Sequence, residues 1–291
     1  MEQITQKPAF VHTLLKGVGQ IMLQENSFTG LLFLIGIFYG SVPMGIGAIL
    51  SVCCGTMTAK ILKYNHDEIK QGLYGFSAAL VGVALPFYFE PVIATWVAVV
   101  IGSALATIIQ HFFIVKKIPV YTLPFILVTW LVLYIFHQVY PVPVSTLLTS
   151  HTSIGYNFAA AARGFGQVIF QGALFSGIVF FIGVFVNTPI AALYALAASV
   201  LGALLATCFS IPTDTIEMGL FGYNAVLCAI VFAGTDKMDG IWVFLATTFA
   251  VAIALFMSTY SLTQLTFPFV AATWITLTIK HFSLKYVVKP A

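Results

Sequence analysis

The sequence predicts an all-α membrane protein made of two inverted-topology repeats. Each repeat is expected to hold about five transmembrane helices, plus broken or re-entrant half-helices around a central pore. Three observations lead to this fold class: the composition, an internal duplication, and short apolar segments interrupted by glycine or polar residues. Of the 291 residues, 60% are hydrophobic and 7% are charged, whereas roughly a quarter of a soluble domain is charged. At roughly twenty residues per crossing, the chain is long enough for about ten spans.

The duplication is clearest in a nine-residue stretch that occurs twice. Residues 72–80 read GLYGFSAAL and residues 219–227 read GLFGYNAVL. Both copies keep two glycines, an aromatic residue at the third and fifth positions, and the closing leucine. The fifth and ninth positions are four residues apart, so they are predicted to share one face of a helix. These positions are held by Phe76 and Leu80 in the first copy and by Tyr223 and Leu227 in the second.

One constant offset of 147 residues relates many other positions of the chain. A proline-bearing motif at residues 118–125 also recurs, displaced by three, at residues 262–269. Such self-similarity predicts an internal duplication, which is typical of transporters and channels. We therefore expect a first transmembrane repeat over residues 1–150 and a second, inverted one over residues 151–291. The paired positions include Gly19 and Gly166, Gln20 and Gln167, Gln24 and Gln171, Gly36 and Gly183, Asp67 and Asp214, and Gly72 and Gly219.

In chain order, the first half opens with two short segments, residues 10–24 and 28–39. Neither is long enough to span a bilayer comfortably alone. We expect them to form one broken or re-entrant element, which is tolerated at membrane depth only where it faces protein or a cavity. An alternative interpretation makes residues 73–89 the re-entrant piece. Further spans are predicted over residues 43–62, over residues 91–115 and from residue 118 onward, followed by a loop over residues 137–157.

The lysines and the single arginine predict the orientation. If the first two segments form one broken crossing, all lysines fall on one side of the membrane and only Arg163 falls on the other. Cytoplasmic loops carry the excess of basic residues, so both termini are predicted to be cytoplasmic. The compact length favours a multi-pass protein of a bacterial inner membrane. The lysines concerned are Lys7, Lys16, Lys60, Lys63, Lys70, Lys116, Lys117, Lys237, Lys280, Lys285 and Lys289.

Ionisable residues are sparse at membrane depth, which weighs against several function classes. Ion-coupled carriers and most membrane enzymes need such groups there, and the histidines show no metal-ligand spacing. No cofactor, metal or nucleic-acid partner is expected. Ser77 lacks a partnered His or Asp, and Asn224 replaces it in the second copy, which disfavours an intramembrane hydrolase. An ammonium or small-amide channel remains an alternative, although no deep histidine pair repeats.

The residues that repeat at depth are polar and uncharged: Gln20 with Gln167, and Thr122 with Thr266. Hydrogen bonding between helices explains such pairs as well. Both pairs, however, lie beside glycine or proline breaks that expose backbone carbonyls. A line of oxygen acceptors suits a solute rich in N–H donors, and aromatic walls suit a planar one. An uncharged constriction leaves ions with most of their dehydration cost, so it refuses them.

These motifs resemble those of the urea transporter family, and of bacterial urea channels within it. The resemblance extends from about Gly17 to Phe269. It rests on the paired Gly-Gln segments, the repeated Gly-Leu-aromatic-Gly-aromatic stretch, and the Pro-x-x-Thr-x-Pro-Phe pattern at residues 119–125. It implies an inverted-repeat channel with one pore per subunit that carries urea passively through the lipid membrane. The family resemblance also implies a homo-oligomer, a trimer or possibly a dimer.

The resemblance implies site residues in both halves. Two polar pairs would form hydrogen-bonding stations for the N–H groups of urea, two aromatic residues would form the faces of the slots, and four aliphatic residues would form the neighbouring and opposite walls. In that order they are Gln20 with Gln167 and Thr122 with Thr266; Phe76 and Tyr223; and Leu80 with Leu227 and Leu23 with Val168.

Four positions depart from the family's pattern. Tyr223 and Leu23 stand where the family usually has phenylalanine, Ser77 replaces a common asparagine, and Thr263 replaces the first proline of the second Pro-x-x-Thr motif. We expect these departures to affect slot width, selectivity and rate. The hydroxyl of Tyr223 is expected either to extend the line of acceptors or to narrow the slot.

Overall fold

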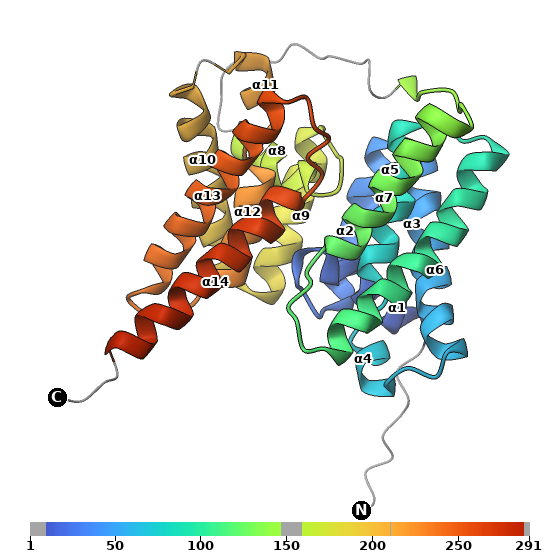
Figure 1. Cartoon of the computed structure of the whole chain (residues 1–291), viewed down its shortest axis with the longest axis horizontal. Coiled ribbons are helices and arrows are strands. Elements are labelled where there is room, and N and C mark those ends of the chain that lie inside the picture. Colours follow the sequence, from blue (N-terminus) through green and yellow to red (C-terminus); the bar gives the residue numbers. More distant parts are fainter. Residues whose placement is uncertain (1–9, 147–158, 210, 288–291) are drawn as a thin grey trace, which may run out of the picture.

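A computed structural model describes residues 10–146, 159–209 and 211–287, and these residues fold almost entirely into helices (Figure 1). The described part contains no β-strand beyond one isolated bridge between Phe89 and Val144. The all-helical fold class is therefore confirmed. The predicted boundary between the repeats, at residues 150 and 151, lies outside the described residues, as do Lys7 and Lys289.

The helices follow the same order in each half of the chain. In the first half they are α1 (Phe10–Gly19), α2 (Ser27–Gly40), α3 (Val42–Ile61), α4 (His66–Lys70), α5 (Phe76–Tyr88), α6 (Ile93–Val115) and α7 (Leu123–Tyr134). In the second half they are α8 (Ala159–Gln167), α9 (Leu174–Asn187), α10 (Pro189–Thr207), α11 (Thr213–Glu217), α12 (Tyr223–Phe232), α13 (Asp239–Thr259) and α14 (Phe267–Val287).

Four of the described helices, α3, α6, α10 and α13, are long and apolar enough to cross a membrane. A fifth span is formed if α1, with its 3-10 extension to Met22, is joined to α2, from which it is bent by 74°. This bend confirms that the first two segments form a broken span or a re-entrant loop. The number of crossings in each half stays a prediction.

The short helices α5 and α12 have 13 and 10 residues. At 1.5 Å per residue they measure about 20 and 15 Å, against a hydrocarbon core about 30 Å thick. Neither crosses a bilayer alone. The structure therefore holds short elements at both places that the two interpretations proposed, and which of them is the re-entrant piece stays a prediction.

The two halves meet where α2 packs against α9, and the contact is reciprocal. The rings of Phe33 and Phe180, which are themselves 147 positions apart, meet edge to face with centroids 5.1 Å apart. A Cβ added at Gly36 would lie 2.4 Å from the ring of Phe180, and one added at Gly183 would lie 2.9 Å from the ring of Phe33. The duplicated glycines are therefore required by the close approach of the two helices.

Hydrogen bonds cross the same interface in both directions. The hydroxyl of Thr29 donates to the carbonyl of Gly183 at 2.7 Å, and the hydroxyl of Ser176 donates to the carbonyl of Gly36 at 2.8 Å. All four residues are buried. Buried polar groups need partners, and here each half supplies a donor to the other.

The break after α1 has an equivalent after α8. Leu23 and Phe170 adopt left-handed backbone conformations, with φ of 58° and 59°. Just beyond them, the side-chain amide of Gln24 donates to the carbonyl of Met22 at 2.8 Å, and that of Gln171 donates to the carbonyl of Ile169 at 3.1 Å. The repeated glutamines thus satisfy carbonyls that the interrupted helices leave free.

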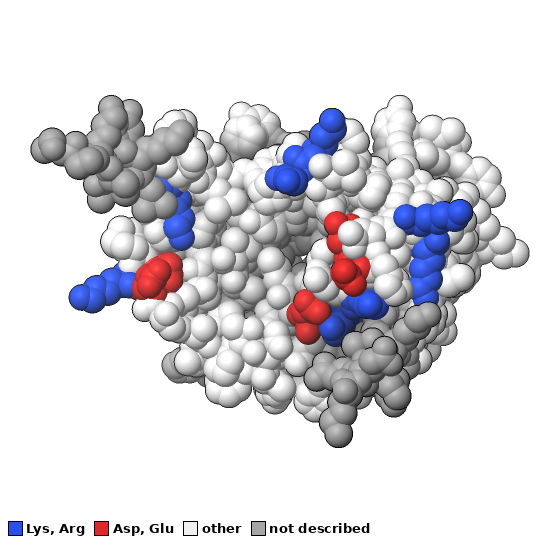
Figure 2. All heavy atoms as spheres, turned by 90° about the horizontal axis from the view of Figure 1, so that it is seen from below, with Lys and Arg blue, Asp and Glu red and all other residues white. Residues whose placement is uncertain are grey.

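The underside of the molecule in Figure 1 is the side on which α4 lies and at which α14 ends. Figure 2 looks at this face and shows several lysine or arginine side chains, together with aspartate or glutamate side chains, spread over an otherwise uncharged surface. Charged side chains on one face fit the predicted lysine-rich side of the membrane. The orientation itself stays a prediction.

Candidate permeation site

A pocket of about 220 Å³ lies in the first half and brings four of the predicted site residues together. Gln20 and Leu23 reach it from the break after α1, Phe76 from the start of α5, and Thr122 from the residue before α7. The lining residues that were not predicted include Gln110, Tyr121 and, from the second half, Phe269. The pocket is therefore built where three interrupted elements meet.

Gln20 is held so that its oxygen is the free end of the amide. Its Nε2 donates to the backbone carbonyl of Gln71 at 3.1 Å, and because a carbonyl only accepts, the NH₂ group must face it. Gly72, with φ of 81°, makes the turn directly after Gln71. A Cβ at Gly72 would also lie 2.4 Å from the backbone nitrogen of Gly17, so this motif glycine is required by both conformation and space.

Gln167 repeats this arrangement in the second half. Its Nε2 donates to the carbonyl of Met218 at 2.9 Å, and Gly219, with φ of 78°, follows Met218 directly. A Cβ at Gly219 would lie 2.6 Å from the backbone nitrogen of Gly164. Each half therefore presents one glutamine whose Nε2 gives one N–H to a backbone carbonyl and whose side-chain oxygen is an available acceptor.

Thr122 and Thr266 meet at the contact between the halves. Their hydroxyl oxygens are 2.7 Å apart, and both residues are buried. Thr122 occupies the N-cap position of α7, yet its side chain makes no capping bond. After sharing one hydrogen bond, the two hydroxyls together keep one donor and three lone pairs. The pair can therefore both accept from and donate to a small polar solute.

The two aromatic residues lie at the first positions of α5 and α12 and are almost equally buried. Phe76 is 7% exposed and Tyr223 is 8% exposed. The hydroxyl of Tyr223 donates to the backbone carbonyl of Leu265 at 2.7 Å. Leu80 and Leu227, one turn further along, are fully buried.

Val168 is buried, and its equivalent in the first half is Ile21. The position that matches Leu23 is Phe170, which shares its left-handed conformation. The Phe170 ring lies among the rings of Phe87, Tyr88 and Phe125, with centroids 5.0, 6.1 and 6.2 Å away. The constant offset of 147 residues was the signal that could have identified Phe170 in the sequence.

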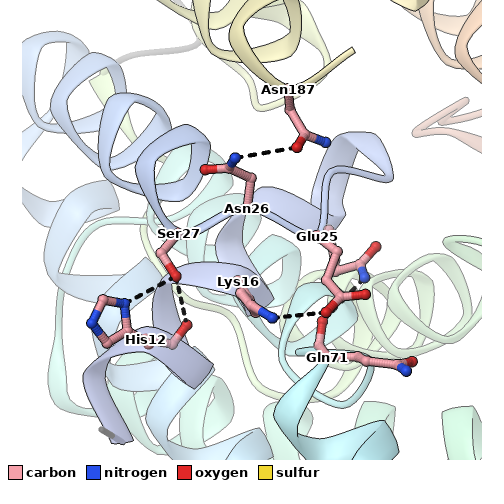
Figure 3. Close-up of polar contacts among 8 residues, drawn as sticks. His12, Lys16, Glu25, Asn26, Ser27, Gln71 and Asn187 are labelled. Carbon is pink, nitrogen blue, oxygen red and sulfur yellow. Dashed lines mark hydrogen bonds and ion pairs between the residues drawn. The ribbon is translucent and has the colours of Figure 1, made fainter. Parts of the chain in front are cut away.

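Charged and amide side chains surround the break that carries Gln20. Lys16 forms an ion pair with Glu25 at 2.7 Å, and Figure 3 shows these two side chains pointing toward one another. In the same view Asn26 faces Asn187 of α9, with Nδ2 of Asn26 donating to Oδ1 of Asn187 at 3.1 Å. The ion pair joins the two sides of the break, and the amide bond joins the two halves.

Ser77 has no catalytic partner among the described residues. Its hydroxyl donates to Oε1 of Gln110 at 3.4 Å, and both residues are buried. No His or carboxylate bonds to Ser77 in this part of the chain. A hydrolase needs a base within reach of its nucleophile, so the serine has the surroundings of a packing residue.

Two tryptophans tie the Pro-x-x-Thr segments crosswise between the halves. Nε1 of Trp130, on α7, donates to the carbonyl of Thr263 at 2.9 Å. Nε1 of Trp274, on α14, donates to the carbonyl of Pro119 at 2.7 Å. Each segment that carries a site threonine is therefore held by a helix of the other half.

Comparison with known proteins agrees with this arrangement. The sequence profile of a family described as "Urea transporter" matches residues 11–281. The chain belongs to the urea transporter family. Curated relatives include Urea transporter 1 of Ovis aries and of Capra hircus, each 26% identical over 301 residues, covering 91% of this chain and 75% of the relative. Urea transporter 1 of Mus musculus is 24% identical over 246 residues, covering 77% of this chain and 63% of the relative.

Membership of the urea transporter family confirms the resemblance found in the sequence. It also makes this chain a membrane protein and a transporter, which agrees with the expectation that it is not an enzyme.

Proposed function

We propose that this protein is a channel through which urea permeates passively and in both directions. The path runs past Gln20 and Phe76, between Thr122 and Thr266, and past Gln167 on the other side. Urea moves along this line by exchanging hydrogen bonds with water for hydrogen bonds with the protein. The aromatic and aliphatic residues give the path a narrow, slot-shaped cross-section that suits a planar solute.

The observation that carries this proposal is the orientation of the two glutamine amides. Backbone carbonyls engage both Nε2 groups, so the amide oxygens are left as acceptors for N–H groups. Leaving an amide group unpaired in an apolar constriction costs roughly 2 kcal/mol or more. Acceptors at the two glutamines and at the threonine pair lower that cost, whereas an ion finds no charge to replace its hydration shell.

We further propose how the chain lies in the membrane. The reciprocal contacts of α2 with α9, and of the two tryptophans, support two halves related by an inverted repeat. The lysine distribution supports cytoplasmic termini. The family resemblance supports a homo-oligomer, a trimer or a dimer, with one pore in each subunit.

The test is urea flux in proteoliposomes, measured by stopped-flow light scattering. The vesicles are mixed with a hyperosmotic urea solution, with no ion gradient present, so that they shrink and then recover their volume as urea enters. Wild type is compared with Gln20→Ala and Gln167→Ala. The matched control is Gln138→Ala, which removes an exposed amide outside the pocket. We expect fast wild-type recovery, about a tenfold loss in each site variant, and no loss in the control, because each site variant removes about one hydrogen bond to the solute.

Two results would contradict the proposal. Wild-type recovery no faster than that of empty vesicles would exclude a urea channel. Recovery that needs a proton or sodium gradient would replace the channel with a coupled carrier.

A further inference from the structure

The pocket of the first half is lined by one amide side chain that the proposed function does not yet use. Gln110 lies in the last turns of α6, lines this pocket and is 4% exposed. Ile114, one helical turn further along, lines the pocket as well, and residues four apart share one face of a helix. The face of α6 that carries these two residues therefore borders the same space as Gln20.

The Gln110 amide is oriented by Ser77, the second residue of α5. The Ser77 hydroxyl, which is 1% exposed, donates to Oε1 of Gln110 at 3.4 Å. A buried hydroxyl proton needs an acceptor, and within the described residues this oxygen is the acceptor that it has. With the amide oxygen turned toward Ser77, the NH₂ group occupies the other side of the amide.

The Nε2 atom of Gln110 keeps both of its N–H bonds free. Within residues 10–146, 159–209 and 211–287, no acceptor receives a hydrogen bond from it. The atom is not enclosed either: this part of the chain leaves five buried side-chain polar atoms without a partner, and Nε2 of Gln110 is not one of them. A nitrogen that is neither bonded nor enclosed, on a buried residue that lines a pocket, opens into that pocket.

The second half is built differently at this place. Lys117 and Ser261, which follow α6 and α13, both adopt left-handed conformations, with φ of 56° and 52°. They are 144 positions apart, and the same displacement puts Ala254, which has no hydrogen-bonding side chain, at the place of Gln110. The amide of the second half is Asn224 on α12, whose Nδ2 is buried without a partner among the described residues. The open amide at Gln110 is therefore a feature of the first half.

We propose that Gln110 is a specificity-determining residue, whose Nε2 donates a hydrogen bond to the carbonyl oxygen of urea in this pocket. Ser77 is a positioning residue that holds the amide in the orientation this bond requires. The inference rests on the proposed urea channel and deepens it. The acceptors at Gln20 and at the threonine pair favour a solute with N–H groups, whereas Gln110 favours a solute with an oxygen acceptor. A solute that pairs with both loses less on leaving water.

Urea and thiourea are the matched probes for this donor. Both are planar and carry four N–H bonds, but thiourea has sulfur in place of the carbonyl oxygen, and sulfur is a weak acceptor. Losing the donor therefore affects urea more than thiourea, whereas losing an acceptor for N–H groups affects both alike. The quantity to measure is the ratio of urea permeability to thiourea permeability in proteoliposomes, each corrected for empty vesicles.

The central variant is Gln110→Met, which keeps the length of the side chain but removes the amide. We expect it to lower the ratio about fivefold, through a loss of urea permeability, because one hydrogen bond to the solute is lost. Ser77→Ala frees the amide to turn its oxygen to the pocket, so it should lower the ratio about twofold. The control is Gln138→Met, the same replacement at an exposed glutamine outside the pocket, and it should leave the ratio unchanged.

Three results overturn the inference while a conducting wild type keeps the proposed function intact. An unchanged ratio in Gln110→Met would mean that the amide does not contact the carbonyl. An equal loss for both solutes would mean that Gln110 acts through its oxygen or through packing. A lower ratio caused by faster entry of thiourea would mean that the pocket had merely widened.

Two further outcomes separate the inference from the proposed function. If the wild type conducts neither solute, the proposed function falls and the inference falls with it. If Gln110→Met does not yield folded protein, Ser77→Ala decides, since an unchanged ratio in that variant overturns the inference.

Discussion

The hydroxyl oxygens of Thr122 and Thr266 lie 2.7 Å apart, although 144 positions separate the two residues in the chain. Their contact is the point where the candidate sites of the two halves touch. It makes the middle of the proposed path a place where each threonine depends on the other for its hydrogen bond.

The first prediction concerns this pair. Thr122→Val and Thr266→Val keep the shape of the side chain but remove a hydroxyl, and each leaves the partner hydroxyl without its bond. We expect each variant to lower urea permeability about tenfold, because losing hydrogen bonding to urea at this point costs about 1.4 kcal/mol. Thr278→Val, at an exposed threonine of α14, is the control. Full permeability in either site variant would remove the threonines from the path.

A second prediction concerns the crossed tryptophans. Trp130→Phe and Trp274→Phe each remove one hydrogen bond to a Pro-x-x-Thr segment of the other half. Trp96→Phe removes a similar bond, to the carbonyl of Pro91 at 3.1 Å, within one half. We expect all three to cost about 1 kcal/mol of stability, but only the first two to lower urea permeability. Equal effects on permeability from Trp96→Phe would show that the crossed arrangement has no special role.

A third prediction concerns the width of the pocket. Leu23→Phe places in the first half the residue type that Phe170 already shows to be compatible with this left-handed conformation. The larger side chain narrows the pocket, so N-methylurea should be excluded more strongly than urea, by about tenfold for one methyl group. Proteoliposome flux with both solutes measures this, and Leu193→Phe, on an exposed part of α10, is the control. A parallel decrease for the two solutes would argue against a steric filter at this position.

A fourth prediction concerns the interface of α2 and α9. Gly36→Ala introduces a Cβ 2.4 Å from the ring of Phe180, and such overpacking costs about 1–3 kcal/mol. Thermal unfolding in detergent should show the loss, and Phe180→Leu in the same chain should restore part of it. Gly240→Ala is the control, because its Cβ would have no neighbour closer than 3.7 Å. Unaltered thermal stability of Gly36→Ala would mean that α2 and α9 accommodate the added methyl group, which would contradict the prediction.

The fold class could be predicted because composition and the constant offset report directly on the solvent and on the duplication. The offset also paired Gln20 with Gln167 correctly, since both occupy the same environment beside a turn glycine. Helix lengths were less predictable. An apolar run such as residues 73–89 gives no indication that the helix begins only at Phe76, because the preceding turn depends on the packing of Gly72 against Gly17.

The site could be predicted only in part. Gln110 is a single glutamine in a long apolar span, and nothing in the sequence indicates that it faces the pocket. The partner of the Tyr223 hydroxyl could not be predicted either, because Leu265 is 42 positions away and only the fold brings its carbonyl to the hydroxyl. Contacts of this kind depend on how distant segments fold together.

The packing of α2 against α9 limits what this protein is able to do for a cell. A pump that concentrates its substrate must open alternately to the two sides, usually by moving one repeat against the other. Glycines that seat phenylalanine rings, and buried hydrogen bonds running both ways, resist such sliding because packed interiors deform little. This resistance fits the proposed channel, which would only equalise urea between two compartments. Continued net entry through such a channel would require a reaction inside the cell that consumes the urea as it arrives.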